Sequence, residues 1–122
     1  MVVGISKEET VVNGGLDQIS SIRYGAKNLI KIVDGGFSTG DYATENELWM
    51  LVAPQVGANT LVVHYSNADV ARNLHIVIYS IYNAEQSTSV MSNFSTSVGV
   101  GNDITTTIST TDKESLVIDL AA

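Results

Sequence analysis

Three carboxylates surround a glycine-rich stretch of the sequence, and their chemistry is that of a cation site. Asp34, Asp41 and Glu45 lie in and just after residues 34–44. Loop carboxylates together with backbone carbonyls are the ligands that Ca²⁺ takes in proteins, but this spacing does not match an EF-hand loop. Two interpretations therefore stay open, a weak Ca²⁺ site and an acidic loop whose carboxylates are simply solvated. No other cofactor is expected.

The same stretch carries two aromatic residues that are candidates for binding. Phe37 and Tyr42 flank Asp41 within residues 34–44. An aromatic face packs against the apolar C–H face of a sugar ring, so these three residues form a candidate glycan site. The alternative interpretation is that the stretch folds back and buries both rings. Trp49 lies between Leu48 and Met50, and this apolar setting predicts that it packs in the core.

Groups that could perform catalysis are sparse. His64 and His75 are the only histidines, the chain has no cysteine, and no serine lies in a nucleophile-elbow pattern. Both histidines fall inside expected strands, which predicts sheet residues with solvated or hydrogen-bonded rings. The glycine-rich pieces lack the following helix and the basic residues of a phosphate site. We therefore expect a chain that is not an enzyme.

The elements that position these residues are short strands. Three runs rich in Val, Ile, Leu and aromatics supply most of the expected core, and they span residues 47–53, 60–65 and 74–82. The last run is almost continuously apolar, which predicts a central strand or one buried on both faces. Further strands are expected at residues 2–6, 19–24, 29–33, 104–108 and 116–120, with a loose edge strand between Val90 and Val100.

Turn signals separate these runs every 8 to 12 residues, and residues 13–15, Asn-Gly-Gly, are the clearest of them. Residues 34–44 are expected to form a surface loop because they are polar and rich in glycine. Alternation predicts that Leu116, Ile118 and Leu120 point inward and Asp119 outward. The pattern predicts one domain over residues 1–122, an all-β antiparallel β-sandwich of about eight to nine strands.

Composition narrows the classes of partner. The chain has 122 residues, 13 acidic against 6 basic, and a formal net charge of −7. This charge repels a phosphate backbone, so nucleic-acid binding is not expected. No apolar stretch approaches the roughly 20 residues of a membrane-spanning helix, so membrane insertion is not expected either. The N-terminus lacks the pattern of a secretory signal, which indicates either that the chain is not exported by that route or that Met1 was added where a longer protein was cut.

Five pieces of the chain, in this order and spacing, resemble a recurrent β-sandwich module of phage virion proteins and of secreted or surface proteins of bacteria and archaea. The pieces are residues 2–6, 19–32, 47–54, 57–63 and 112–119. The resemblance covers essentially the whole chain and implies a jelly-roll-like, non-catalytic domain with a Trp-containing strand at its centre. Such modules continue at both ends, so either the chain is a minimal form or a neighbouring copy supplies the missing edge.

The resemblance implies a structural or assembly module of a virion or cell-surface structure. It would act through protein–protein contacts of strand edges and loops, as a homo-oligomer or with neighbouring virion or surface proteins. The alternative function is a carbohydrate-binding module that recognises surface glycans. Either function places the protein in a virion, outside the cell or on its surface.

Overall fold

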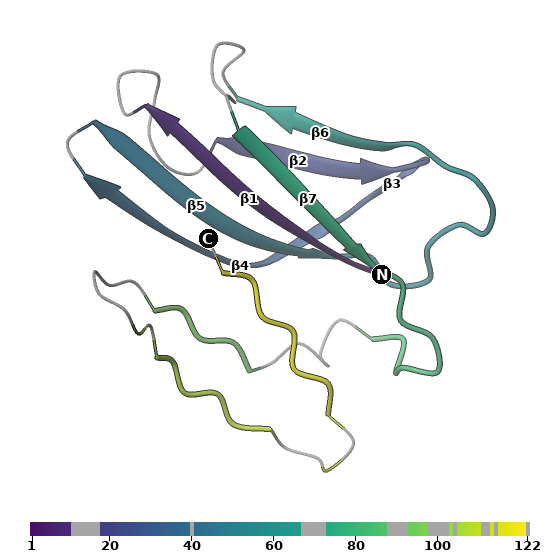
Figure 1. Cartoon of the computed structure of the whole chain (residues 1–122). Helices are drawn as coiled ribbons and strands as arrows, with labels where there is room; N and C mark the ends of the chain where they lie inside the picture. The colour runs from purple at the N-terminus through teal and green to yellow at the C-terminus, as the bar shows by residue number, and fades with distance from the viewer. Residues whose placement is uncertain are drawn as a thin grey trace.

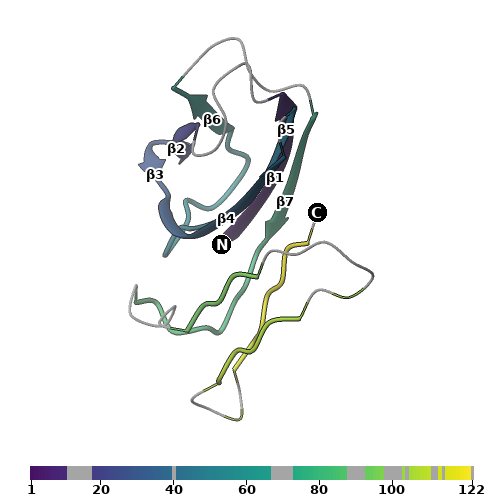
Figure 2. The same cartoon turned by 90° about the vertical axis from the view of Figure 1, so that its left-hand side faces the viewer.

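The chain folds into two antiparallel sheets packed face to face, as the computed structural model shows (Figures 1 and 2). The structure describes residues 1–10, 18–39, 41–66, 73–87, 93–97, 103, 105–110, 113 and 115–121. Within these ranges every regular element is a strand, so the expected antiparallel β-sandwich is confirmed. Among these residues no helix is of the length and apolarity that crossing a membrane requires.

Seven strands make up the described part of the sandwich, where the sequence predicted eight or nine. The first sheet has the order β4 (Ile30–Thr39), β5 (Tyr42–Met50), β1 (Val2–Thr10) and β7 (Asn73–Tyr79). The second sheet has the order β3 (Lys27–Asn28), β2 (Ile19–Tyr24) and β6 (Leu61–Tyr65). We call the face of the first sheet that meets the second its inner face, and the opposite one its outer face.

Apolar side chains of both sheets form the core between them. One buried cluster joins Val3 and Ile5 of β1, Ile22 of β2 and Trp49 of β5. Trp49 is 5% exposed, which confirms that it packs in the core. Simple alternation in β2 would place Ile19 and Ile22 on opposite faces, yet both are buried. An irregularity in the β2–β6 register between Ile19 and Ser21 changes the alternation there.

Residues 34–44 do not form the predicted surface loop. They belong to a long hairpin, in which β4 runs to Thr39 and β5 begins at Tyr42. Two of the glycines that suggested a loop, Gly35 and Gly36, lie inside β4 instead, and Gly40 falls outside the described residues. A Cβ on Gly35 would come within 3.1 Å of the Thr96 Cγ2, so glycine at this point allows another chain segment to approach the strand closely.

The apolar run at residues 74–82 was expected at the centre of a sheet, and this prediction is wrong. Its strand, β7, is the edge strand, whereas β1 is central and pairs with both β5 and β7. A continuous apolar run is typical of a strand buried on both faces, but an edge strand with exposed apolar side chains has the same pattern.

The C-terminal part of the chain lies against the outer face of the first sheet. Residues 93–97, 105–110 and 115–121 run side by side without being strands (Figures 1 and 2). Ile118 and Leu120 are less exposed than Val117 and Asp119, as alternation predicted, but Leu116 is exposed. The other anchors expected around Val90 to Val100, Phe94 excepted, fall outside the described residues, as does the turn at residues 13–15.

Candidate functional site

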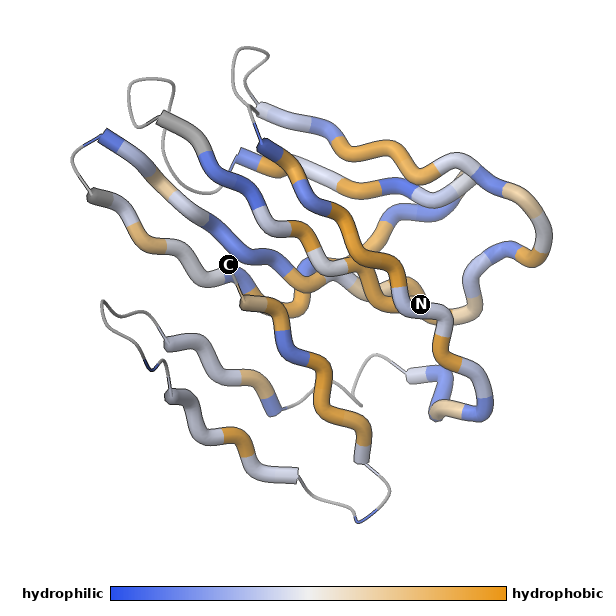
Figure 3. Tube along the Cα trace, in the orientation of Figure 1, coloured by the Kyte–Doolittle hydropathy of each residue, from blue (hydrophilic) through white to orange (hydrophobic). Residues whose placement is uncertain are grey.

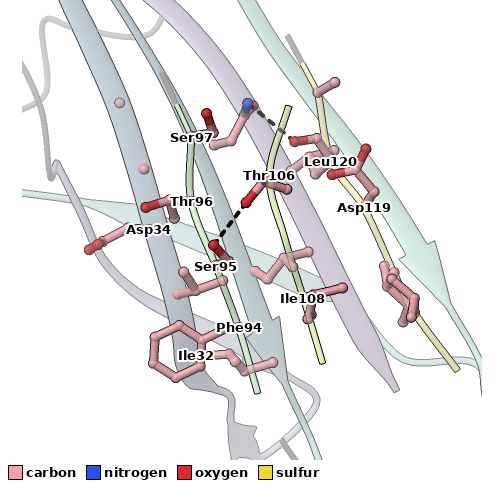
Figure 4. A pocket seen from close by; sticks show the side chains of 18 of the residues that line it. Ile32, Asp34, Phe94, Ser95, Thr96, Ser97, Thr106, Ile108, Asp119 and Leu120 are labelled. Atoms are coloured by element: carbon pink, nitrogen blue, oxygen red, sulfur yellow. Dashed lines mark hydrogen bonds between the residues drawn. The ribbon is translucent and has the colours of Figure 1, made fainter. Parts of the chain in front are cut away.

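A cavity of about 420 Å³ lies between the β4–β5 hairpin and the three C-terminal segments (Figure 4). Ile32 and Phe37 of β4 and Leu48 of β5 line it from the sheet, and Phe94 and Ile108 line it from the opposite side. Hydroxyl groups lie among these apolar groups, and one of them, the Thr106 Oγ1, donates a 2.8 Å hydrogen bond to the Ser95 Oγ. The cavity therefore offers both apolar contact and hydrogen bonding.

Two polar features mark the cavity chemically. The described residues that line it include Asp34 and Asp119 and no Lys, Arg or His. The Asn46 Nδ2 donates a 3.5 Å hydrogen bond to the Leu120 carbonyl, while the buried Asn46 Oδ1 has no hydrogen-bond partner among the described residues. A neutral ligand that carries hydroxyl groups fits this lining better than an anion does.

The candidate glycan residues are divided by the structure. Phe37 lines the cavity and is 39% exposed, so its ring is not buried by the hairpin. Asp41 lies in the turn between β4 and β5 and is exposed, and Tyr42 is 55% exposed at the start of β5. Neither Asp41 nor Tyr42 lines the cavity. Sequence reasoning did not single out Phe94, whose aromatic side chain within a polar Ser/Thr/Asn tract was the available signal.

The three candidate metal ligands are also separated. The Asp34 carboxylate forms an ion pair with the Lys31 ammonium at 3.3 Å. Glu45 forms an ion pair with Lys7 at 2.7 Å on the inner face. In the part of the chain that the structure describes, no three His, Asp or Glu side chains gather as a metal site would require. Asp34, Asp41 and Glu45 are therefore not brought to one point here.

The inner face of the first sheet carries a buried charged cluster that the sequence analysis did not predict. Glu47 accepts hydrogen bonds from the Trp49 Nε1 at 2.5 Å and from the Lys31 Nζ at 3.3 Å. The Lys31 ammonium also lies 5.3 Å from the centre of the Trp49 ring. Burial raises the pKa of Glu47, while the bond from Trp49 and the charge of Lys31 act in the opposite direction.

The alternation of side chains along a strand explains how this cluster arises. Glu45, Glu47 and Trp49 are spaced two residues apart in β5, so all three side chains point to the inner face. The register places Lys7 opposite Glu45 and Lys31 opposite Trp49. The signal in the sequence was the two-residue spacing of acidic residues leading to a core Trp. Each charge has a partner, so the cluster is suited to fixing strand register.

The third feature is the free edge of β7. Its register with β1 places Leu74, Ile76 and Ile78 on the inner face, opposite Lys7, Ile5 and Val3. The side chains from Ile76 to Tyr79 are nevertheless 40%, 38%, 50% and 40% exposed. Figure 3 shows this strand as a largely apolar stretch. In the described part of the chain, no strand pairs with the outer edge of β7, and its apolar side chains are exposed on both faces.

The two histidines lie in strands, as expected, and are exposed. His64 is in β6, where its carbonyl accepts a 3.1 Å hydrogen bond from the Ser20 Oγ, and His75 is in β7. Among the described residues, neither belongs to a group of three His, Asp or Glu side chains that could hold a metal ion.

Comparison with known proteins identified no relative: no protein-family model, curated protein or solved structure matches this chain.

Proposed function

We propose that the chain is a non-enzymatic assembly module of a virion or cell-surface structure, which contacts other protein chains through the edge of β7. The observation that carries this proposal is the exposure of four consecutive apolar side chains on that edge strand, from Ile76 to Tyr79. An edge strand presents a row of unpaired N–H and C=O groups, so an apolar and uncharged edge favours pairing with another chain.

The other edges of the two sheets support this choice by contrast. β4 carries the charged residues Lys31 and Asp34 and has a register irregularity between Lys31 and Val33. β3 is only two residues long, and the side chains of β6 are half-buried apart from His64. Charge, a bulge and a short length are the devices that protect an edge from pairing. β7 has none of these devices, and it contains no Asp, Glu, Lys or Arg.

The total accessible surface supports association as well. The chain exposes 8040 Å². A compact monomer of 13.0 kDa is expected to expose about 6300 Å² from the scaling of surface with mass. The excess of roughly 1700 Å² exceeds the ~800 Å² that each partner buries in a standard interface. Among the described residues, β7 and the C-terminal segments carry several of the exposed apolar side chains, among them Ile78, Phe94 and Leu116.

The test is the absolute mass of the purified chain in solution, measured by light scattering on a sizing column from about 1 µM to about 1 mM. An assembly module is expected to exceed the 13.0 kDa of one chain as concentration rises. A mass that stays at 13.0 kDa over the whole range would contradict the proposal.

A second candidate function, recognition of a surface glycan, is favoured by one specific observation. Phe37 and Phe94 are both partly exposed and line the same cavity, together with hydroxyl-bearing side chains and Asn46. Such a lining suits a neutral sugar, since aromatic rings stack on pyranose faces and amides and hydroxyls bond to sugar hydroxyls.

The glycan candidate is tested by binding to an array of neutral oligosaccharides, with Phe37→Ala and Phe94→Ala as variants. Tyr82→Ala is the matched control, because Tyr82 is an exposed aromatic residue that does not line the cavity. Binding that both phenylalanine variants lose and the control keeps would support this function. If the wild-type protein binds no oligosaccharide on the array, glycan recognition is contradicted.

A further inference from the structure

The two faces of β7 differ in a way that restricts its partner. Leu74, Ile76 and Ile78 share the inner face, where they continue the apolar row that Val3 and Ile5 begin in β1. His75, Val77 and Tyr79 share the outer face. A partner strand must therefore present three apolar side chains on one face, at two-residue spacing.

A second copy of β7 meets this requirement when it runs antiparallel and the two-fold axis passes through Ile76. Ile76 then lies opposite Ile76 of the second copy, and Leu74 lies opposite Ile78 on each side of the axis. All six inner-face aliphatic side chains are paired in this register. If the two-fold axis passed through Val77 instead, Leu74 would lie opposite the polar Ser80.

We infer that this protein forms a symmetric dimer in which β7 pairs antiparallel with β7 of a second copy, centred on Ile76. This inference rests on the proposed assembly function and names its partner. The two four-stranded sheets then form one continuous sheet of eight strands across the axis. A two-fold interface of this kind uses the same patch on both chains, so a single exposed strand suffices.

The charges of the molecule do not oppose this contact locally. The chain carries a net charge of −7, but β7 contains no Asp, Glu, Lys or Arg. The long-range repulsion between two acidic chains is screened by salt, whereas apolar contact and backbone hydrogen bonds are not. The dimer is therefore expected to tighten as the NaCl concentration rises from about 10 mM to about 150 mM.

The first experiment compares Ile76→Lys with Ile30→Lys by light scattering on a sizing column. Both positions are exposed isoleucines at edges of the same sheet, Ile76 in β7 and Ile30 in β4. Ile76→Lys places two ammonium groups face to face at the axis, so we expect the dissociation constant of the dimer to rise about 100-fold or more. Ile30→Lys is expected to leave the dimer unchanged, and thermal unfolding confirms that both variants fold.

The second experiment uses the absence of cysteine from the chain. Residues directly opposite in an antiparallel pair have Cα atoms about 4.5–5.5 Å apart, within the range that a disulfide bridges. Oxidised Ile76→Cys is therefore expected to run as a covalent dimer on a non-reducing gel, whereas Ile30→Cys stays monomeric.

The outcomes separate this inference from the function on which it rests. A wild-type oligomer that Ile76→Lys leaves intact would overturn the β7 pairing while leaving the assembly function in place. A dimer that Ile76→Lys dissociates, but that Ile76→Cys does not link, would overturn the register centred on Ile76. A wild-type chain that remains monomeric up to about 1 mM would overturn both.

Discussion

Lys7 and Glu45 lie directly opposite one another in β1 and β5, and their charged groups meet at 2.7 Å. The two side chains are only 2% and 4% exposed, so this ion pair is removed from water. A buried charge is costly when its partner is missing, but the pair is tolerated while both members are present. The pair therefore acts as a constraint on how β1 and β5 align, because a shift in register would separate the two charges.

Removal of either partner is expected to destabilise the protein strongly. Lys7→Met leaves the Glu45 carboxylate buried without its ammonium, at an expected loss of about 3–5 kcal/mol in the free energy of unfolding. The double variant Lys7→Met/Glu45→Leu is expected to be more stable than Lys7→Met. Urea unfolding measures both, with the exposed Lys113→Met as the control. A double variant no more stable than Lys7→Met would contradict the expected coupling of the two charges.

Glu47 is expected to make the stability depend on pH. Burial raises its pKa above the ordinary value of 4.5, so the folded state holds this proton more tightly than the unfolded state does. The free energy of unfolding therefore falls as the pH rises from 4.5 through the raised pKa of Glu47. Glu47→Gln removes this contribution. The free energy of unfolding of this variant, measured from pH 4 to 8, should therefore fall less with rising pH than that of the wild type. The exposed Glu8→Gln is expected to retain it.

The hydrogen bond from Trp49 to Glu47 is expected to matter beyond the packing of the ring. Trp49→Phe keeps an aromatic ring in the core but removes the Nε1 donor from a buried carboxylate, at an expected cost of about 1–3 kcal/mol. Loss of this donor should also raise the pKa of Glu47 further, because the bond favours the charged form. Denaturant unfolding at two pH values measures both effects. An equal loss of stability in Trp49→Phe and in Trp49→Phe/Glu47→Gln would contradict the role of the bond.

Gly4 is expected to control the docking of the last described segment. A Cβ at this position would lie 3.4 Å from both Leu120 methyl carbons and 3.5 Å from the Leu48 Cδ2, in ordinary contact. Gly4→Ala should therefore be accepted, whereas Gly4→Leu needs the space that Leu120 occupies and should cost about 1–3 kcal/mol. Hydrogen exchange of residues 115–121 should accelerate in Gly4→Leu and stay near the wild-type rate in Gly4→Ala. Unchanged exchange in both variants would show that Leu120 does not dock on Gly4.

The sequence alone predicted those features that depend only on the residues of one strand. Val, Ile and aromatic runs between turn residues predicted an all-β antiparallel sandwich, and the strands at β1, β2 and β6 were located to within a few residues. The apolar neighbours of Trp49 predicted its burial. Strand formation and burial follow from local alternation, so these features could be read without knowing which strands are neighbours.

Tertiary structure decided the features that depend on neighbouring strands. An apolar run does not reveal its place in a sheet, so only the strand order showed that β7 is an edge. Glycines near acidic residues suggested a loop, whereas the approach of Thr96 gives Gly35 its place inside β4. The contacts of Lys7 with Glu45 and of Lys31 with Glu47 join distant parts of the chain, so they arise only once strand register is set. The charges and apolar residues were visible in the sequence, but their partners were chosen by the pairing of strands.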